Sequence, residues 1–429
     1  MENKKLKVGN VPPLRFPGFE GEWETKKLGE IMDFKVTNSF SRDNLNYENG
    51  FVKNIHYGDI HTKYQTLFDI ANEVTPYINN EINIHRILEE NYCQEGDVIF
   101  ADASEDLKDV GKSIEVINLN GEKLLSGLHT LLARPQKNIF YLGFNGYLFK
   151  SNSVRTQIQK ESQGTKVLSI STGRISKIKL SFPNLKEQQK IASFFSLIDQ
   201  RIATQNKIIE QLETLIKGLR EKLFSQETRF REFKDEWKLK RLREIGETFN
   251  GLSGKTKDNF GIGKPYIQYK QIFDSSKIQI GNCGLVEILE TENQNNVQYG
   301  DVFFTISSET PNEIGMSSVL LDEVSEMYLN SFCFGYRPLS SQILNPLFSS
   351  YLFRSSTFRN EIVKLAQGST RYNMSKIELM KLTILLPCLE EQIFIAKLLY
   401  SIELKIETEK KILEEYRSQK QYLLQNLFI

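Results

Sequence analysis

The sequence is poor in the residues from which disulfides and metal sites are made. Its 429 residues include 4 cysteines and 4 histidines. The cysteines are scattered and form no C-x-x-C pair; they are Cys93, Cys283, Cys333 and Cys388. Isolated cysteines of this kind are typical of reduced core thiols. We therefore expect a cytoplasmic protein that binds no metal.

Long hydrophobic runs and an excess of one charge are also missing. No run approaches the roughly 18 apolar residues of a membrane span, and the first residues carry charges without the apolar stretch of a secretory signal. The net charge is +1, whereas a protein that only holds nucleic acid nonspecifically is usually more basic. We expect no membrane partner, and DNA binding would have to come from local patches.

No stretch that resembles a catalytic motif meets the requirements of that motif. Residues 251–256, GLSGKT, have two residues between the glycines where a P-loop has four. The only Pro-Pro pair, Pro12-Pro13, is followed by leucine and not by the aromatic residue of an amino-methyltransferase motif. His56 and His61 are five residues apart, and the sequence shows no third ligand that would make them a metal site. No nucleophile, base and orienting group come together, so we predict no catalytic residue and no bound cofactor.

The sequence does contain two copies of a stretch with the pattern of a long amphipathic helix. Residues 186–224 and 390–428 have no proline and repeat apolar residues at helical spacing. The two stretches align without a gap, 204 positions apart. Two such copies in one chain indicate a pair of helices that pack on each other. The expected packing positions are Ile191, Ile198, Ile202, Leu212 and Leu219 in the first copy and Ile395, Ile402, Ile406 and Leu423 in the second.

The rest of the chain is duplicated as well. RFPGFEGEWETKKLGEI, from Arg15, corresponds to RFREFKDEWKLKRLREI, from Arg229, and the pair includes the only 2 tryptophans. GDVIF at Gly96 corresponds to GDVFF at Gly300. The agreement runs through most of both halves, as expected for a tandem repeat of a unit of roughly 200 residues.

Each unit has short β-rich runs broken by Gly, Asn and Ser turns, a late helix and then the long helix. This order predicts an α/β (α+β) fold with two tandem-duplicated globular domains, each followed by a long α-helix. The expected segments are a tail at 1–14, a first domain at 15–185, a central helix at 186–224, a second domain at 225–388 and a C-terminal helix at 389–429.

The junction of domain and helix resembles a known family. The run QGTKVLSISTGRISKIKLSFPNLKEQQKIASFFSLIDQRI and its partner QGSTRYNMSKIELMKLTILLPCLEEQIFIAKLLYSIELKI are similar to a hallmark of the specificity subunits of type I restriction–modification systems. Both have a Gln-Gly loop, β-runs up to a proline, and an acidic-Gln pair that opens a helix. The opening around the tryptophan is similar to the start of that family's domain.

This resemblance implies two target recognition domains joined by two helices in an antiparallel coiled coil. Each domain would read one half of a split, asymmetric site in double-stranded DNA. The helices would bind two methyltransferase (modification) subunits, and restriction/translocase subunits would join through that core. S-adenosylmethionine, ATP and Mg2+ would then belong to the partner subunits, and this chain would be non-catalytic.

The two copies agree at apolar positions and turns but diverge in polar loops. Base edges are read by side chains that must vary with the sequence recognised, so the divergent loops are the candidates for DNA contact. The candidates in the first domain are Asn38, Ser41, Arg42, His56, Tyr57, His61, Lys63, Ser104, Lys108, Lys112, Gln163, Gly164, Thr165 and Lys166. Those in the second are Ser253, Lys255, Lys257, Tyr269, Lys270, Ser308, Thr310, Gln367, Gly368, Ser369, Thr370, Arg371 and Tyr372.

Two other classes of function stay open on the residues alone. A fused modification–restriction enzyme would need the motifs that are missing here. A structural coiled-coil scaffold that never touches nucleic acid would account for the helices, but not for two large domains that differ in their loops.

Overall fold

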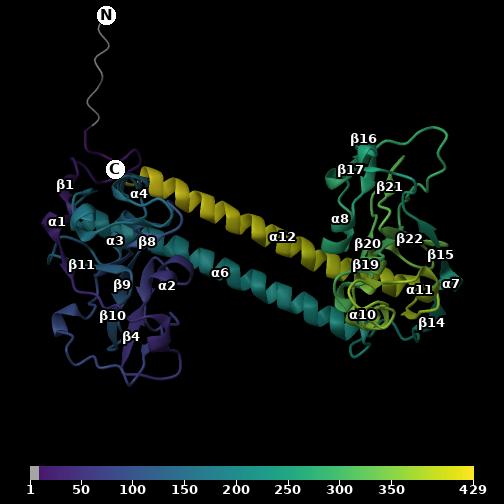
Figure 1. Cartoon of the computed structure of the whole chain (residues 1–429), viewed down its shortest axis with the longest axis horizontal. Helices are drawn as coiled ribbons and strands as arrows, with labels where there is room; N and C mark the ends of the chain where they lie inside the picture. Colours follow the sequence, from purple (N-terminus) through teal and green to yellow (C-terminus); the bar gives the residue numbers. More distant parts are fainter. Residues whose placement is uncertain (1–8) are drawn as a thin grey trace, which may run out of the picture. The chain divides into compact units, whose positions relative to one another are not determined.

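The computed structural model describes residues 9–429, and within them two compact units form (Figure 1). The first unit runs up to Asn206 and also includes Lys411–Ile429, and the second is Lys207–Lys410. Each unit is a mixed α/β domain, as the sequence predicts. The boundary between the units falls inside the two long helices, α6 (Leu185–Phe224) and α12 (Leu389–Asn426). Each domain is therefore completed by parts of both helices.

The first domain has a five-stranded sheet in the order β2-β11-β7-β9-β5 and a four-stranded sheet in the order β10-β4-β6-β3. Two further pairs, β1-β13 and β12-β8, are antiparallel. The strands are β1 (Glu24–Lys27), β2 (Met32–Lys35), β3 (Leu45–Asn46), β4 (Val52–Ile55), β5 (Leu67–Asp69), β6 (Tyr77–Ile78), β7 (Val98–Ala101), β8 (Ala103–Ser104), β9 (Ser113–Asn118), β10 (Lys123–Ser126), β11 (Thr130–Pro135), β12 (Leu168–Ser169) and β13 (Lys179–Phe182). The helices are α1 (Leu28–Ile31), α2 (Tyr57–Thr62), α3 (Phe144–Leu148), α4 (Asn152–Glu161) and α5 (Thr172–Ile175).

The second domain repeats this plan with a four-stranded sheet, β15-β22-β18-β20, and a three-stranded sheet, β17-β16-β21. The pairs β14-β24 and β19-β23 correspond to β1-β13 and β8-β12. The strands are β14 (Lys238–Arg241), β15 (Gly246–Asn250), β16 (Phe260–Ile267), β17 (Gly284–Val286), β18 (Val302–Thr305), β19 (Ser307–Ser308), β20 (Ser317–Val319), β21 (Tyr328–Leu329), β22 (Cys333–Pro338), β23 (Tyr372–Asn373) and β24 (Thr383–Leu386). The helices are α7 (Leu242–Ile245), α8 (Tyr269–Asp274), α9 (Pro346–Leu352), α10 (Ser356–Val363) and α11 (Lys376–Leu379).

The repeated Gly-Asp-Val motif builds the centre of each sheet. All four residues of β7 and of β18 are buried, which is why both strands consist mainly of apolar residues. The aspartate just before each strand binds an arginine on the neighbouring strand: Asp97 pairs with Arg134 and Asp301 with Arg337, each at 2.7 Å. The motif is therefore a structural one.

The acidic-Gln pair that opens each long helix is structural too. In the first domain, Arg15 donates to both carboxylate oxygens of Glu187 at 2.8 Å. The next residue, Gln188, accepts from the backbone N–H of Tyr141 and donates to the carbonyls of Ile139 and Pro183. The second domain repeats these contacts with Arg229, Glu391 and Gln392.

The core of each domain includes the end of one long helix and the start of the other. In the first domain, the Phe428 ring near the end of the chain lies 5.9 Å from that of Phe195 on α6 and 6.3 Å from that of Trp23. In the second, Phe224 at the end of α6 packs against Trp237, and its core cluster also holds Ile395 of α12. The start of one helix meets the end of the other in both units, so α6 and α12 pair in the antiparallel sense.

The predicted packing positions of the helices lie on the side that faces the cores. Four of them are buried, namely Ile191, Ile198, Ile395 and Ile406. The others are partly buried, namely Ile202, Leu212, Leu219, Ile402 and Leu423. Ion pairs run beside them, from Lys420 to Asp199 in the first unit and from Lys410 to Glu213, at 2.7 Å, in the second.

Candidate nucleic-acid interface

In the first domain, candidate side chains from separate loops meet at helix α2. Arg42 donates to both carboxylate oxygens of Asp59 on this helix, each at 2.7 Å. Lys63, directly after the helix, lies 3.0 Å from the same carboxylate and donates to the hydroxyl of Tyr47 at 3.0 Å. These contacts hold the loop at residues 38–47 against α2.

The charges around Asp59 leave an excess of one positive charge at this place. The Asp59 side chain is 1% exposed, while those of Arg42 and Lys63 are 42% and 49% exposed. Burial works to raise the pKa of Asp59, but Arg42 and Lys63 outweigh it and the pKa is lowered. One carboxylate therefore orients two cations whose outer edges remain open to a ligand.

Three of the 4 histidines in the sequence surround Tyr57, the first residue of α2. Its ring lies 4.6 Å from that of His56, 6.1 Å from His61 and 5.3 Å from His129. His56 is buried, and burial lowers its pKa, so its ring is neutral at pH 7. His129 is half exposed and lies 3.3 Å from the carboxylate of Asp102.

The Gln-Gly loop lies beside the segment that follows β7. Strands β8 and β12 pair so that Ser104 faces Leu168, and Ile170 donates its backbone N–H to the carbonyl of Asp102 at 2.8 Å. Lys112, from the same segment, donates to the carbonyl of His61 on α2 at 2.7 Å. Candidates from the divergent polar loops of the first domain therefore lie around one helix.

The second domain places its candidates around α8 in the same way. The hydroxyl of Tyr269, the first residue of α8, donates to the carbonyl of Ser307 at 2.7 Å. Strands β19 and β23 pair Ser308 with Tyr372. Burial raises the pKa of Tyr269, while the nearby charge of Arg371 acts to lower it. The Gln-Gly loop of this domain is thus also close to the start of the helix.

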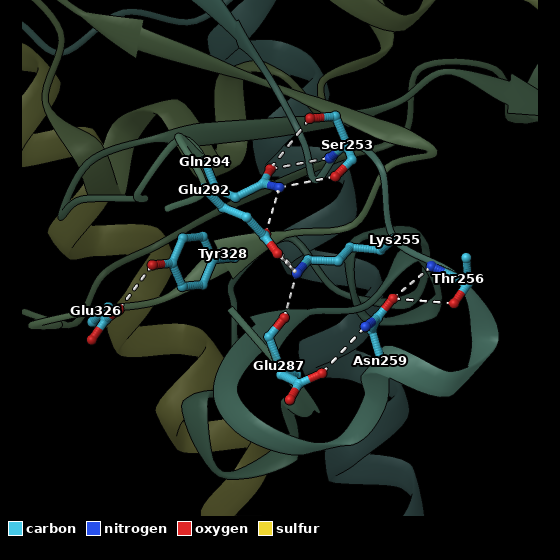
Figure 2. A network of polar contacts seen from close by, with 9 residues as sticks. All are labelled: Ser253, Lys255, Thr256, Asn259, Glu287, Glu292, Gln294, Glu326 and Tyr328. Carbon is cyan, nitrogen blue, oxygen red and sulfur yellow. Dashed lines mark hydrogen bonds and ion pairs between the residues drawn. The ribbon is translucent and has the colours of Figure 1, made fainter. Parts of the chain in front are cut away.

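One of the candidate cations, Lys255, is already engaged inside the second domain. Figure 2 shows Lys255 pointing into a polar network, where its ammonium lies 2.6 Å from Glu292 and donates to the carbonyl of Glu287. The Lys255 side chain is 4% exposed. Gln294 in the same network accepts from Ser253. This arrangement orders the loop after β15 and leaves little of Lys255 for a ligand.

The candidate residues differ widely in exposure. Seventeen are exposed: Ser41, Arg42, Lys63, Lys108, Gln163, Gly164, Thr165, Lys166, Ser253, Lys257, Lys270, Thr310, Gln367, Gly368, Ser369, Thr370 and Arg371. Eight are partly buried: Asn38, Tyr57, His61, Ser104, Lys112, Lys255, Tyr269 and Tyr372. His56 and Ser308 are buried and act as supports of the surface.

Several residues of this surface were not among the sequence candidates. Asp59, Tyr47 and Asp102 position the predicted side chains, and His129 adds an exposed one. Asp59 and Asp102 lie within the divergent polar loops, but neither was among the residues chosen from them. No sequence signal marked His129, since its position next to Tyr57 depends on how β10 and β11 are connected.

Among residues 9–429, no group of three or more His, Cys, Asp or Glu side chains could hold a metal ion. Within the same residues, no helix is both long and apolar enough to cross a membrane.

Comparison with known proteins places both domains in one family. The family model for the type I restriction modification DNA specificity domain matches residues 20–214 and 234–416. The putative type I restriction enzyme MjaX specificity subunit of Methanocaldococcus jannaschii is 25% identical over 442 residues, which cover 98% of this chain and 94% of that protein. The MjaVIII specificity subunit of the same organism is 26% identical over 302 residues, or 65% of this chain and 68% of that protein.

Solved structures share the fold. The S subunit of a type I restriction-modification system from M. genitalium matches with a TM-score of 0.52 and 16% identity, over 98% of this chain and 99% of that one. The HsdS subunit from Thermoanaerobacter tengcongensis matches with a TM-score of 0.52 and 18% identity, over 97% and 98%. Two matched domains, with equivalent loops around equivalent helices, make this chain a member of the type I restriction–modification DNA specificity family.

Proposed function

We propose that this specificity subunit reads a bipartite, asymmetric site in double-stranded DNA, one half with each domain. The observation that carries this proposal is the contrast between scaffold and loops. The ion pairs Asp97–Arg134 and Asp301–Arg337 recur at equivalent places, whereas the side chains around α2 and α8 differ. A protein that reads two different half-sites with one fold requires this combination.

The exposed cations suit the phosphate backbone and the exposed amides and hydroxyls suit base edges. Lys63 and Lys166 in the first domain, and Lys257 and Arg371 in the second, would neutralise phosphates. Gln163, Gln367 and their neighbours in the Gln-Gly loops would reach bases. Asp59 would set the orientation of the Arg42 guanidinium. The fixed N–H donors of a guanidinium favour a ligand that offers two acceptors side by side.

The partners we propose are the other subunits of a type I restriction–modification complex in the cytoplasm. Two methyltransferase (modification) subunits would bind to the paired helices, and restriction/translocase subunits would join through them. S-adenosylmethionine, ATP and Mg2+ would be held by those partners. The curated relatives are named specificity subunits, and this chain has no motif of a fused modification–restriction enzyme.

The loop at residues 367–372 offers the test of modular reading. The full chain is used to select from a pool of randomised DNA duplexes, and the wild type is compared with a variant whose 367–372 loop is replaced by Gly and Ser residues. We expect the variant to lose the base preferences of one half-site and to keep those of the other. If both half-sites change together, the domains do not read separately; if the wild type selects no sequence, the scaffold alternative is favoured.

Cofactor binding separates the non-catalytic reading from a fused enzyme. Calorimetric titration of S-adenosylmethionine into the pure full chain should give no heat of binding. Stoichiometric binding would contradict the assignment of the methyl donor to a partner subunit.

A further inference from the structure

Each domain has a short turn beside the candidate surface that the divergent stretches did not include. In the first domain it is Gly127–Thr130, which leads from β10 into β11, and in the second it is Asn330–Cys333, which leads from β21 into β22. The sequences GLHT and NSFC have no residue in common, so the two turns diverge as the candidate loops do, although neither was among the candidates.

The backbone holds both turns in the same place. The first residue of each turn donates its N–H to the residue just before the helix segment: Gly127 to the carbonyl of Ile55 at 2.9 Å, and Asn330 to that of Ile267 at 3.0 Å. Ile55 is followed by His56 and the start of α2, and Ile267 occupies the same position before α8. One end of each turn is therefore fixed beside the helix at the centre of the candidate surface.

The other end of each turn is fixed toward the Gln-Gly loop. In the first domain, Asp102 donates its N–H to the carbonyl of His129 at 3.0 Å, and Ile170 donates to the carbonyl of Asp102 at 2.8 Å. In the second domain, Ile306 donates to the carbonyl of Phe332 at 3.0 Å, and Met374 donates to the carbonyl of Ile306 at 2.9 Å. The turn, the segment after the central strand and the end of the Gln-Gly loop thus lie side by side in both domains.

The side chains at the tip of this shared scaffold are exposed and chemically different. His129 is 53% exposed as a side chain and Phe332 is 60% exposed as a residue. His129 also has φ 54°, a left-handed conformation that a side-chain-bearing residue adopts at a cost. His129 keeps about half of its side chain in solvent beside Tyr57 and Asp102, and Phe332 keeps more than half of its surface exposed, so the tip of each turn is open to a ligand.

We infer that these turns are further recognition elements and that His129 and Phe332 are specificity-determining residues, each contacting a base of the half-site read by its own domain. This inference rests on the proposed function. His129, beside Asp102, would hydrogen-bond to a polar base edge. Phe332 has no polar atom and would pack on an apolar one such as the methyl group of thymine, or between two bases.

The test uses the full chain and a pool of randomised DNA duplexes. The variants are Phe332→Ala and His129→Gly, and glycine is chosen because it adopts φ 54° without strain. Leu239→Ala and His85→Ala are the matched controls, since Leu239 is 64% exposed on β14 and His85 is an exposed histidine that lines a cavity with Val52 and Tyr92. Phe332→Leu is measured as well, so that a folding defect in one variant does not decide the outcome.

We expect Phe332→Ala to weaken the preference at one or two positions of a single half-site by roughly tenfold. His129→Gly should do the same in the other half-site, with a melting temperature equal to or above that of the wild type. The controls should keep every preference of the wild type.

Three results would contradict this expectation. Unchanged preferences in both variants would overturn the inference and leave the proposed function standing. A uniform fall in affinity for DNA, with the same bases preferred, would also overturn the inference. The side chains would then contact only the sugar–phosphate backbone of the DNA. If the wild type enriches no sequence at all, the proposed function fails first, and the inference fails with it.

Discussion

The first and second domains place a different cation two residues after the equivalent helices α3 and α9. Lys150 in the first donates one hydrogen bond, to the hydroxyl of Thr66 at 2.6 Å, and burial lowers its pKa to about 7. Arg354 in the second reaches four backbone carbonyls, those of Ile272, Phe273, Ser275 and Ser317. The arginine joins the second domain's segments together, and the lysine does much less for the first.

A second difference in sequence between the two domains lies close to the first. Glu115 of β9 is buried, and its carboxylate accepts from the backbone N–H groups of Gly143 and Gly146 at 2.8 and 2.7 Å, at the start of α3. The second domain has the apolar Val319 on β20, and Asn345 caps α9 by accepting from the N–H of Phe348. A duplicated fold can thus keep its backbone while the residues that satisfy it change place.

The largest expected effect concerns which domain each helix end supports. Phe428→Ala should lower the free energy of unfolding of the first domain, and Phe224→Ala that of the second, each by about 3–5 kcal/mol because a buried ring is removed from the core. Hydrogen exchange with mass spectrometry on the full chain locates the loss. Faster exchange in the second domain after Phe428→Ala would contradict the packing described here.

The next effect is the contrast between the two cations. Arg354→Met should cost about 3 kcal/mol or more, since it removes the hydrogen bonds to four partly buried backbone carbonyls. Lys150→Met should change the stability of the first domain by about 1 kcal/mol or less, because the buried ammonium it removes is poorly satisfied. Denaturant unfolding of the two variants measures both values. Equal costs would mean that the four carbonyl contacts contribute little.

The pH dependence of stability should differ between the domains. Between the lowered pKa of Lys150, about 7, and its ordinary 10.5, the unfolded chain binds a proton that the folded chain does not, so the stability of the first domain rises with pH in this window. Burial raises the pKa of Glu115 to about 8. The folded chain then keeps a proton that the unfolded one loses, and stability falls as pH rises from 4.5 toward 8.

Lys150→Met provides the measurement of the first effect. Relative to this variant, the wild-type first domain should gain up to about 1 kcal/mol per pH unit between pH 7 and 9. Thermal unfolding followed by hydrogen exchange separates the domains, and the second domain, which has Arg354 and Val319 at these positions, serves as the internal reference. A constant difference between wild type and variant would show that Lys150 keeps its proton.

The smallest effect distinguishes two lysines of one loop. Lys257→Ala should weaken binding to duplex DNA a few-fold and reduce the slope of log affinity against log salt by about 1, since Lys257 is exposed. Lys255→Ala should leave the salt slope unchanged, because its ammonium is held by Glu292. Titrations at several salt concentrations test the pair. A reduced slope for Lys255→Ala would mean that the network opens on binding.

Much of the architecture could be predicted from the sequence because its signals are periodic. The spacing of apolar residues predicted both long helices, and the repeated motifs predicted two domains of one mixed α/β fold; both are confirmed. The polar loops chosen from sequence divergence lie near one another in each domain, and their contact with DNA stays a prediction. The roles of single residues within them were harder, since Lys255 and His56 turn inward while Lys63 and Arg371 remain exposed.

By itself, the sequence determined the duplication, the helix pairing and the family, since these depend on residue spacing and on motifs that lie close together along the chain. Only the tertiary structure decided that the last residues of the chain complete the first domain and that Asp59 orients Arg42. It alone placed His129 and Phe332 at equivalent turns. Such contacts join segments that are distant along the chain, and the course of the backbone between them, set by the packing of the whole domain, brings them together.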